Sequence, residues 1–193
     1  MANKITEIKL EDLGYDEFFD LKWKSLKLLN FSIARVIAEH REAYKVKNTG
    51  GEYLAKITGK QVFNAIKRAD YPAVGDWVAI TKLDEERAVI QNILPRKTIL
   101  QKKYSDKPDI QIIATNIDVA FIIESLDRDF NLNRFERYFV LANEGGIKPV
   151  IILNKIDLVS GVELNQKIKQ LKNRFNNIDI ISTVPLRNRV LMN

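Results

Sequence analysis

The chain has 193 residues, of which 46% are hydrophobic and 29% charged, values typical of a globular protein with one large or two small domains. It has no cysteine and one histidine, His40, so disulfides, thiolate metal sites and histidine metal clusters are excluded within these residues. We expect His40 to lie on the surface or at a strand end. The formal net charge of +6 permits a nucleic-acid partner. Because no apolar run approaches the ~18 residues of a membrane span and no secretory signal is recognisable, we expect a cytoplasmic monomer without membrane contact.

The first 31 residues form an N-terminal extension of mixed character. Acidic residues and lysines alternate there with apolar side chains that include Phe18, Phe19 and Trp23. This pattern predicts a short amphipathic helix or an arm that docks on the rest of the chain. It assigns no task to the segment.

Short strands dominate residues 32–95. Alternation with period two runs through 33–39 and 43–47, and a turn at 48–51 then leads into a partner strand at 52–57. Further strands are predicted at 77–80 and 88–93. Five short strands in about 65 residues predict a closed β-barrel of the OB type, a fold that commonly binds nucleic acid. The alternative is a barrel that only packs against its neighbour.

Positive charge is concentrated in the middle of the chain. Residues 32–109 contain 15 basic and 10 acidic residues, and residues 96–109 are predicted to be a basic linker. A phosphate-rich partner is therefore expected here, with a solvated loop as the alternative. The candidate RNA-binding residues are Arg96, Lys97, Lys102 and Lys103, and Lys107 adds to the same run of charge.

Residues 110–193 have the texture of an α/β domain. Apolar strands are predicted at 110–114, 119–124, 150–153 and 178–181, with amphipathic helices at 132–144 and 162–175. Asn131 is placed to cap the first helix, and Gly145-Gly146 to end it. The alternation of strands and helices predicts a doubly wound α/β unit with a parallel sheet.

The motif Asn154-Lys155-Ile156-Asp157 follows the apolar strand at 150–153 directly. It matches the NKxD pattern that reads guanine, and ligands bind at the carboxyl ends of strands in such sheets. A carboxylate at Asp157 can accept hydrogen bonds from the ring N–H and the exocyclic amine of guanine, a pair that adenine lacks. Asn154 can brace the loop or approach the base oxygen, and the stem of Lys155 can lie over the purine. The alternative is a polar turn without a ligand.

Ser182 ends the next predicted strand, where GTP-binding domains carry a Ser-Ala loop that closes over the base; Thr183 stands where alanine is usual. The alternative is a strand that simply leaves its sheet. Phosphates need a GxxxxGK[ST] loop at a helix N-terminus, and this sequence contains none, since Gly59-Lys60 is followed by Gln61. No catalytic residue and no metal ligand is therefore predicted.

Four segments resemble the RsgA (YjeQ) family of circularly permuted, ribosome small-subunit-dependent GTPases. They match its PAVGDWV motif, the entry to its GTPase domain, its DFNLRRLERYL helix and its KPVVVLNKADL strand and loop, and they lie at residues 71–78, 113–118, 129–138 and 148–157. The resemblance implies an N-terminal OB-fold barrel followed by a partial, circularly permuted P-loop-type GTPase domain that retains the guanine-binding half. In this family NKxD comes ahead of the phosphate loop. This order explains why a barrel, and not a phosphate loop, precedes Asn154.

The family resemblance also implies partners and cofactors. These are the small ribosomal subunit with its rRNA, and GTP or GDP, bound weakly here; Mg²⁺ and Zn²⁺ are expected of the intact family, but their motifs are absent from this sequence. Intact members are expected to hydrolyse GTP during late maturation of the small subunit, whereas this chain looks truncated after Ser182 and is not expected to do so. The alternative function is a non-catalytic RNA- or ribosome-binding module with at most weak guanine binding.

Overall fold

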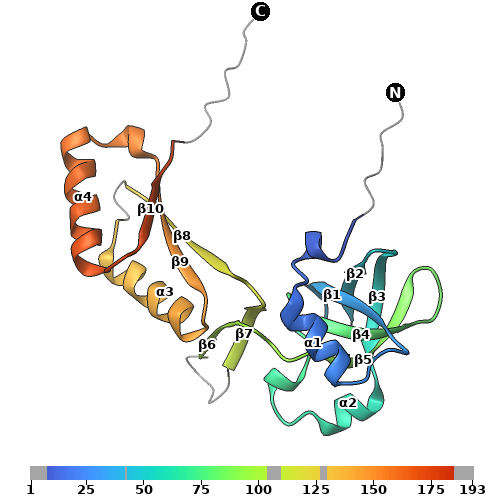
Figure 1. Cartoon of the computed structure of the whole chain (residues 1–193). Helices are drawn as coiled ribbons and strands as arrows, with labels where there is room; N and C mark the ends of the chain where they lie inside the picture. Colours follow the sequence, from blue (N-terminus) through green and yellow to red (C-terminus); the bar gives the residue numbers. More distant parts are fainter. Residues whose placement is uncertain (1–7, 42, 104–109, 127–129, 185–193) are drawn as a thin grey trace, which may run out of the picture. The chain divides into compact units, whose positions relative to one another are not determined.

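The computed structural model describes residues 8–41, 43–103, 110–126 and 130–184. The chain forms two compact units, residues 1–117 and residues 118–193 (Figure 1). Within the described ranges, no helix combines the length and the apolarity that crossing a membrane requires.

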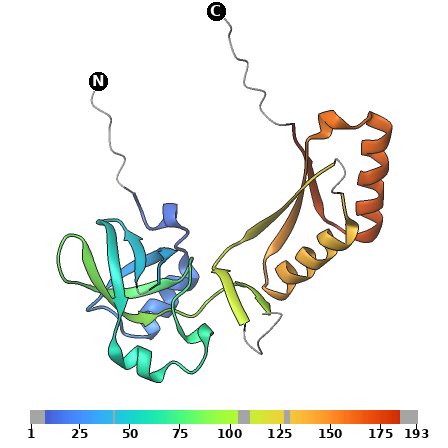
Figure 2. The same cartoon turned by 180° about the vertical axis from the view of Figure 1, so that it is seen from behind.

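The first unit contains a closed barrel of five strands in the order β1-β2-β3-β5-β4 (Figures 1 and 2). The strands are β1 (Ser32–Glu39), β2 (Tyr44–Asn48), β3 (Gly51–Ile57), β4 (Trp77–Lys82) and β5 (Arg87–Ile93). Only the β3–β5 pair is parallel, and β4 closes the barrel by pairing with β1. The predicted OB-like barrel is therefore confirmed.

Alternate side chains of the five strands fill the barrel interior, as the period of two requires. The buried set includes Val36, Val46, Tyr53, Ile80 and Ile90. A second cluster covers the outside of β4, where Phe19 and Leu28 pack on Trp77. Phe19 belongs to helix α1 (Glu17–Ser25), which follows the short turn η1 (Glu11–Leu13), so the N-terminal extension supplies an amphipathic helix that packs on the barrel.

A short helix, α2 (Gly59–Asn64), and a helical turn, η2 (Arg68–Asp70), connect β3 to β4. The sequence pattern predicts neither of them. Thr58 and Gln61 form a reciprocal capping box, in which each side chain bonds to the backbone N–H of the other residue. This local pairing fixes the start of a helix of only six residues.

Strands β6 (Ile99–Lys103) and β7 (Ile110–Thr115) form a separate antiparallel pair that belongs to the first unit. This arrangement differs from the prediction of a linker at 96–109 and of an α/β domain that starts at residue 110. The physical reason is pairing: residues 99–103 find hydrogen-bond partners in 110–115, so β7 is not part of the parallel sheet. Residues 104–109, including Lys107, lie outside the described residues.

The second unit is a three-stranded parallel sheet with two helices. Its elements are β8 (Val119–Ser125), α3 (Leu132–Glu144), β9 (Lys148–Asn154), η3 (Ile156–Leu158), α4 (Gly161–Arg174) and β10 (Asp179–Ser182). The strand order β10-β9-β8 advances in one direction, so right-handed crossovers place both helices on one face of the sheet (Figures 1 and 2). The predicted α/β class is confirmed, and Asn131 caps α3 as expected. The doubly wound arrangement is not observed in the described residues, because a doubly wound sheet has helices on both faces and α3 and α4 lie on the same face.

The helix-covered face of the sheet is buried against apolar side chains of α3 and α4, among them Phe135 and Leu171. On the opposite face, Phe121, Ile123 and Ile181 remain exposed. Successive side chains of β8 and β9 point to opposite faces of the sheet. Ile122 and Ile151 are therefore buried under the helices, whereas Phe121 is exposed.

Candidate functional site

The predicted guanine-reading motif occupies the carboxyl end of β9. Asn154 is the last residue of the strand, and Lys155 adopts the left-handed conformation, with φ +58°, before the turn η3. The backbone N–H of Lys155 donates to Oδ1 of Asn154 over 2.8 Å. A left-handed conformation at a residue other than glycine costs about 1–3 kcal/mol, and such strain is commonly found at functional sites.

The loop after β10 is hydrogen-bonded to the motif. Ser182 lies opposite Leu153 in the parallel ladder, and the backbone N–H of Thr183 donates to the carbonyl oxygen of Leu153 over 2.8 Å. The carbonyl oxygen of Thr183 then accepts from the N–H of Ile156 over 3.3 Å. These two bonds hold the segment after β10 against the NKID loop.

Asn154 links all three strand ends. Its side-chain Oδ1 accepts a second hydrogen bond, from Oγ1 of Thr183 over 3.2 Å, and its backbone oxygen accepts from the N–H of Leu126 over 3.1 Å. Asn154 therefore braces the loop, one of the two roles that the sequence left open. From the sequence, Thr183 is only a departure from the usual alanine, and its hydroxyl contact with Asn154 is visible only in the structure.

The structure thus brings the four predicted guanine-binding residues to one edge of the sheet. Asn154 and Lys155 are half-buried, whereas Asp157 and Ser182 are exposed. A carboxylate, an amide and a lysine stem therefore lie along the same edge, and these are the groups on which the guanine-reading hypothesis depends. Binding itself stays a prediction.

A buried carboxylate that the sequence reasoning missed lies at the end of β8. Glu124 accepts a hydrogen bond from the N–H of Asn131 over 3.3 Å, and Nε of Arg134 lies 3.6 Å from its Oε1. Glu124 is 5% exposed. Because a buried charge needs partners, Glu124 fixes the start of α3 against the strand end next to the candidate site. The sequence carries one indication of this buried carboxylate, namely an acidic residue within the apolar stretch 119–124.

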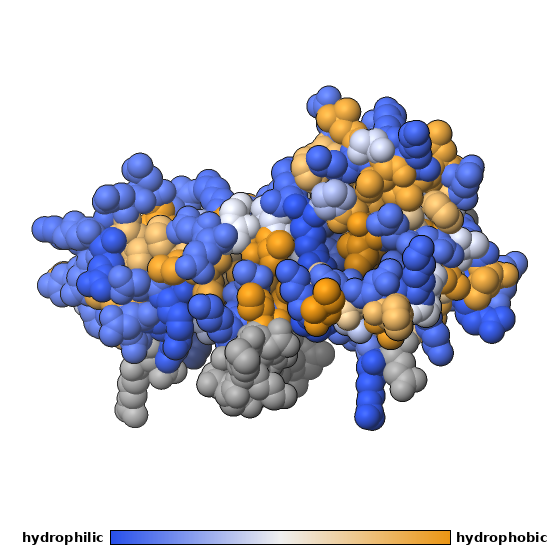
Figure 3. Space-filling model, turned by 90° about the horizontal axis from the view of Figure 1, so that it is seen from below, coloured by the Kyte–Doolittle hydropathy of each residue, from blue (hydrophilic) through white to orange (hydrophobic). Residues whose placement is uncertain are grey.

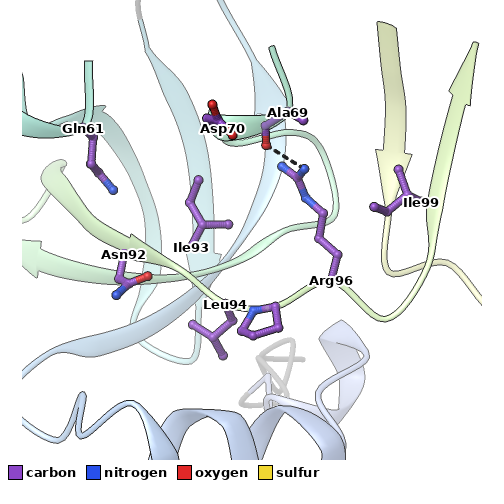
Figure 4. A pocket seen from close by; sticks show the side chains of 9 residues that line it. Gln61, Ala69, Asp70, Asn92, Ile93, Leu94, Arg96 and Ile99 are labelled. Carbon is purple, nitrogen blue, oxygen red and sulfur yellow. Dashed lines mark hydrogen bonds between the residues drawn. The ribbon is translucent and has the colours of Figure 1, made fainter. Parts of the chain in front are cut away.

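In the first unit, Arg96 has a structural role. Its guanidinium donates to both carboxylate oxygens of Asp76, over 2.8 and 2.7 Å, and to the carbonyl oxygen of Tyr71 over 2.9 Å. It also donates to the carbonyl oxygen of Ala69 over 2.9 Å (Figure 4). Asp76 is fully buried, and it also accepts from Oγ1 of Thr115. These hydrogen bonds disfavour the phosphate contact predicted for Arg96. To reach a phosphate, the guanidinium would have to break its buried bidentate pair with Asp76.

The three predicted lysines differ in their surroundings. Nζ of Lys97 lies 2.8 Å from Oδ2 of Asp16, and this hydrogen bond is the main reason that the pKa of Asp16 falls below its ordinary value. Lys102 and Lys103 are exposed on β6. Lys102 also borders a polar hollow of about 620 Å³ that is lined by Glu39, His40, Arg41 and Arg68. His40 accordingly stands at the surface, as expected.

An OB-like barrel followed by an α/β unit, with no phosphate-loop sequence ahead of the NKID loop, is typical of circularly permuted GTP-binding folds. The RsgA GTPase family model matches residues 93–188. Small ribosomal subunit biogenesis GTPase RsgA 2 of Lactiplantibacillus plantarum is 44% identical over 126 residues, covering 65% of this chain and 36% of the relative. RsgA of Opitutus terrae is 39% identical over 159 residues, covering 77% of this chain and 43% of the relative. This chain belongs to the RsgA family.

Solved structures agree with this assignment. The crystal structure of YjeQ from Thermotoga maritima has a TM-score of 0.61 and 25% identity, over 79% of this chain and 51% of that one. YloQ, a circularly permuted GTPase, has a TM-score of 0.57 at 21% identity, which shows the shared fold. The chain spans less than half the length of the two curated relatives described above.

Proposed function

We propose that this protein acts in biogenesis of the small ribosomal subunit as an RsgA-type factor, in which the barrel contacts rRNA and the α/β unit reads guanine. The observation that carries the proposal is the bonded pair of loops at the carboxyl edge of the sheet, where Thr183 holds Asn154 and the NKID turn. The relatives are named as small-subunit biogenesis GTPases, and this supports the choice of partner. We also propose that the protein is cytoplasmic, as this partner implies, and that it is a monomer.

The proposed guanine selectivity rests on Asp157. Its carboxylate accepts from the ring N–H and the exocyclic amine of guanine, whereas adenine presents an acceptor and no matching pair of donors. Lys155 covers the purine with its stem, and Ser182 lies at the edge that closes over the base. Since Asp157 and Ser182 are exposed and the sequence of residues 1–193 holds no GxxxxGK[ST], binding is weak, with a dissociation constant on the order of a millimolar.

Hydrolysis by these 193 residues alone is not part of the proposal. Phosphoryl transfer depends on phosphate positioning and on Mg²⁺, and the sequence of this polypeptide contains no motif for either. Intact relatives are proposed to supply both, together with a zinc-binding domain. The alternative function is a non-catalytic RNA- or ribosome-binding module, and the exposure of Asp157 favours it. We expect the purified polypeptide to show no GTP turnover above background.

For RNA, we propose contacts by Lys102 and Lys103, with Lys97 as a third cation that Asp16 holds in place. Arg96 is left out of this set because its guanidinium binds Asp76. Binding to purified small subunits should weaken as salt rises, with a log–log slope of about −0.7 to −0.9 per phosphate contact. Replacing both Lys102 and Lys103 by Gln should reduce the slope by about 1.4 to 1.8. Salt-independent binding would contradict the RNA contact.

The test of guanine reading is equilibrium dialysis with GMP, XMP and AMP on the wild type and on Asp157→Asn. The amide can donate to the C2 carbonyl of xanthine, so the variant should prefer XMP, whereas the wild type should prefer GMP. The matched control is Asp179→Asn, an exposed carboxylate at the opposite end of β10, which should leave the preference for GMP unchanged. Equal binding of GMP and AMP by the wild type would refute the guanine-reading role.

A further inference from the structure

The segment between β3 and β4 exposes large apolar side chains. Phe63 in α2 is 88% exposed and Ile66, just after the helix, is 95% exposed, while Val62 is 49% exposed. Helix α2 lies at the bottom of Figure 1. Figure 3 views the molecule from below, and this side shows apolar residues at the surface among hydrophilic ones. Large apolar side chains exposed close together on one segment make it a candidate for a binding surface.

This segment is held in place at both ends. The capping box of Thr58 and Gln61 fixes its start. The Asp70 carboxylate accepts from the backbone N–H groups of Ile66 and Lys67, over 2.9 and 3.0 Å, and these bonds lower the pKa of that carboxyl. Arg96 then ties the carbonyl oxygen of Ala69 to the buried Asp76. Because the backbone is already ordered, a ligand of Phe63 meets little entropic cost of ordering the segment.

Helix geometry explains why Phe63 points outward. Gln61 lies on the barrel side of α2, where it borders a hollow of about 540 Å³ together with Asn92 and Ile93 (Figure 4). Phe63 follows two residues later, which is about 200° around a helix, so it points away from the barrel. The exposed ring is therefore a consequence of which side of α2 packs.

Charge indicates the chemistry of the partner. Lys60 and Lys67 are exposed and flank Phe63 on either side in the sequence. Lysine is depleted from the cores of protein–protein interfaces, whereas aromatic rings set among basic side chains are typical of surfaces that bind single-stranded nucleic acid. The only acid between residues 58 and 70 is Asp70, which is engaged as a cap. The segment thus favours an anionic ligand with flat faces.

We propose that residues 60–67 are a docking surface for unpaired RNA, in which a base stacks on Phe63 while Lys60 and Lys67 contact the adjoining phosphates. Ile66 covers the edge of the stacked base. This inference rests on the proposed ribosomal RNA partner and adds to it a site separate from Lys102 and Lys103. Recognition of this kind tolerates many sequences, because every base has a flat face for the ring.

The experiment measures binding of purified small ribosomal subunits and of a 12-nucleotide oligouridine to the 193-residue protein. Phe63→Leu keeps an apolar side chain but removes the ring, and it should weaken binding of both probes by about 5- to 150-fold. Phe63→Trp keeps a ring, so it should bind as the wild type does, and oligouridine should quench its added fluorescence. The double variant Lys60→Gln, Lys67→Gln should lower the salt slope for oligouridine by about 1.4.

Leu83→Ala is the matched control, because Leu83 is an exposed apolar residue in the β4–β5 turn of the same barrel, and it should bind as the wild type does. If Phe63→Leu binds small subunits as tightly as the wild type, the stacking site is refuted while the proposed function stands. Loss of binding in Phe63→Asp but not in Phe63→Leu would indicate docking to a ribosomal protein and would also overturn the inference. Failure of the wild type to bind either probe would refute both proposals.

Discussion

Oγ1 of Thr183 lies 3.2 Å from Oδ1 of Asn154, and this hydrogen bond joins the loop after β10 to the last residue of β9. It is made by a hydroxyl at a position where alanine is usual in GTP-binding domains. The side chain of Asn154 is therefore fixed before any nucleotide arrives, since its oxygen also accepts from the N–H of Lys155.

We predict that Thr183→Val weakens GMP binding about 2- to 10-fold, because a net hydrogen bond contributes about 0.5–1.5 kcal/mol. The methyl group that replaces the hydroxyl keeps the shape of the side chain but cannot donate to Asn154. Thr183→Ser retains the hydroxyl and should bind GMP as the wild type does in the same dialysis measurement. Equal affinity of the valine and serine variants would show that the contact does not organise the loop.

The buried pair of Asp76 and Arg96 predicts a large effect on stability. Arg96→Met keeps most of the side-chain volume but leaves the Asp76 carboxylate buried without its cation, so the free energy of unfolding should fall by about 3–5 kcal/mol. Urea denaturation measures this change. Lys102→Met removes an exposed charge instead and should change the stability by less than about 0.5 kcal/mol. A stable Arg96→Met variant would contradict the structural role of this guanidinium.

Asp16 and Lys97 predict a dependence of stability on pH. The pKa of Asp16 is lower in the folded protein than its ordinary value of 3.8, mainly because of the hydrogen bond with Lys97. A lowered carboxyl pKa stabilises the fold above that ordinary value, and the contribution is lost as the pH falls through the folded-state pKa. The pair is largely exposed, so the contribution is at most about 1 kcal/mol.

The matched variant for this pH effect is Asp16→Asn. Asparagine caps a helix about as well as aspartate, so α1 keeps its N-cap while the charge on the partner of Lys97 is removed. Urea unfolding should show a stability difference between wild type and variant at pH 7 that shrinks below pH 4. A difference that stays constant down to pH 2 would assign the effect to capping rather than to charge.

The surroundings of Gly75 and Gly59 lead us to predict opposite effects of replacing each glycine by alanine. A Cβ at Gly75, where φ is +96°, would lie 2.0 Å from the carbonyl oxygen of Thr115, whereas a Cβ at Gly59 meets nothing within 4 Å. Gly75→Ala should lose about 1–3 kcal/mol through its backbone conformation alone, and the clash adds to that loss. Gly59→Ala should gain about 0.4–1 kcal/mol. Thermal unfolding distinguishes them, and a neutral Gly75→Ala would contradict the close approach.

The sequence predicts the repetitive parts of the fold well. The strands at 33–39 and 52–57 and the helix at 132–144 follow from periodicity, because each buries one face. The pairing of 110–115 with 99–103 could not be predicted in the same way. An apolar strand shows its length in the sequence but not its partner, and the partner decides to which unit it belongs.

The candidate site was predicted from residue type and order, since NKID follows an all-apolar strand. Its supporting contacts were not predicted, because Thr183 and Glu124 act through three-dimensional neighbours that are 29 and 7 residues away in sequence. Arg96 illustrates the converse. A run of basic residues resembles a phosphate-binding surface, and only the fold reveals that one of its members faces the buried Asp76.

Chemical-shift mapping of the ¹⁵N-labelled protein tests the guanine-reading claim most directly. Titration with GMP should shift the backbone amides of Lys155, Ile156, Asp157 and Thr183, with a dissociation constant on the order of a millimolar. AMP at the same concentrations should leave these amides in place, and Asp157→Asn should abolish the response to GMP. Identical shifts with GMP and AMP, or shifts that persist in Asp157→Asn, would contradict the assignment of this loop as a guanine-binding site.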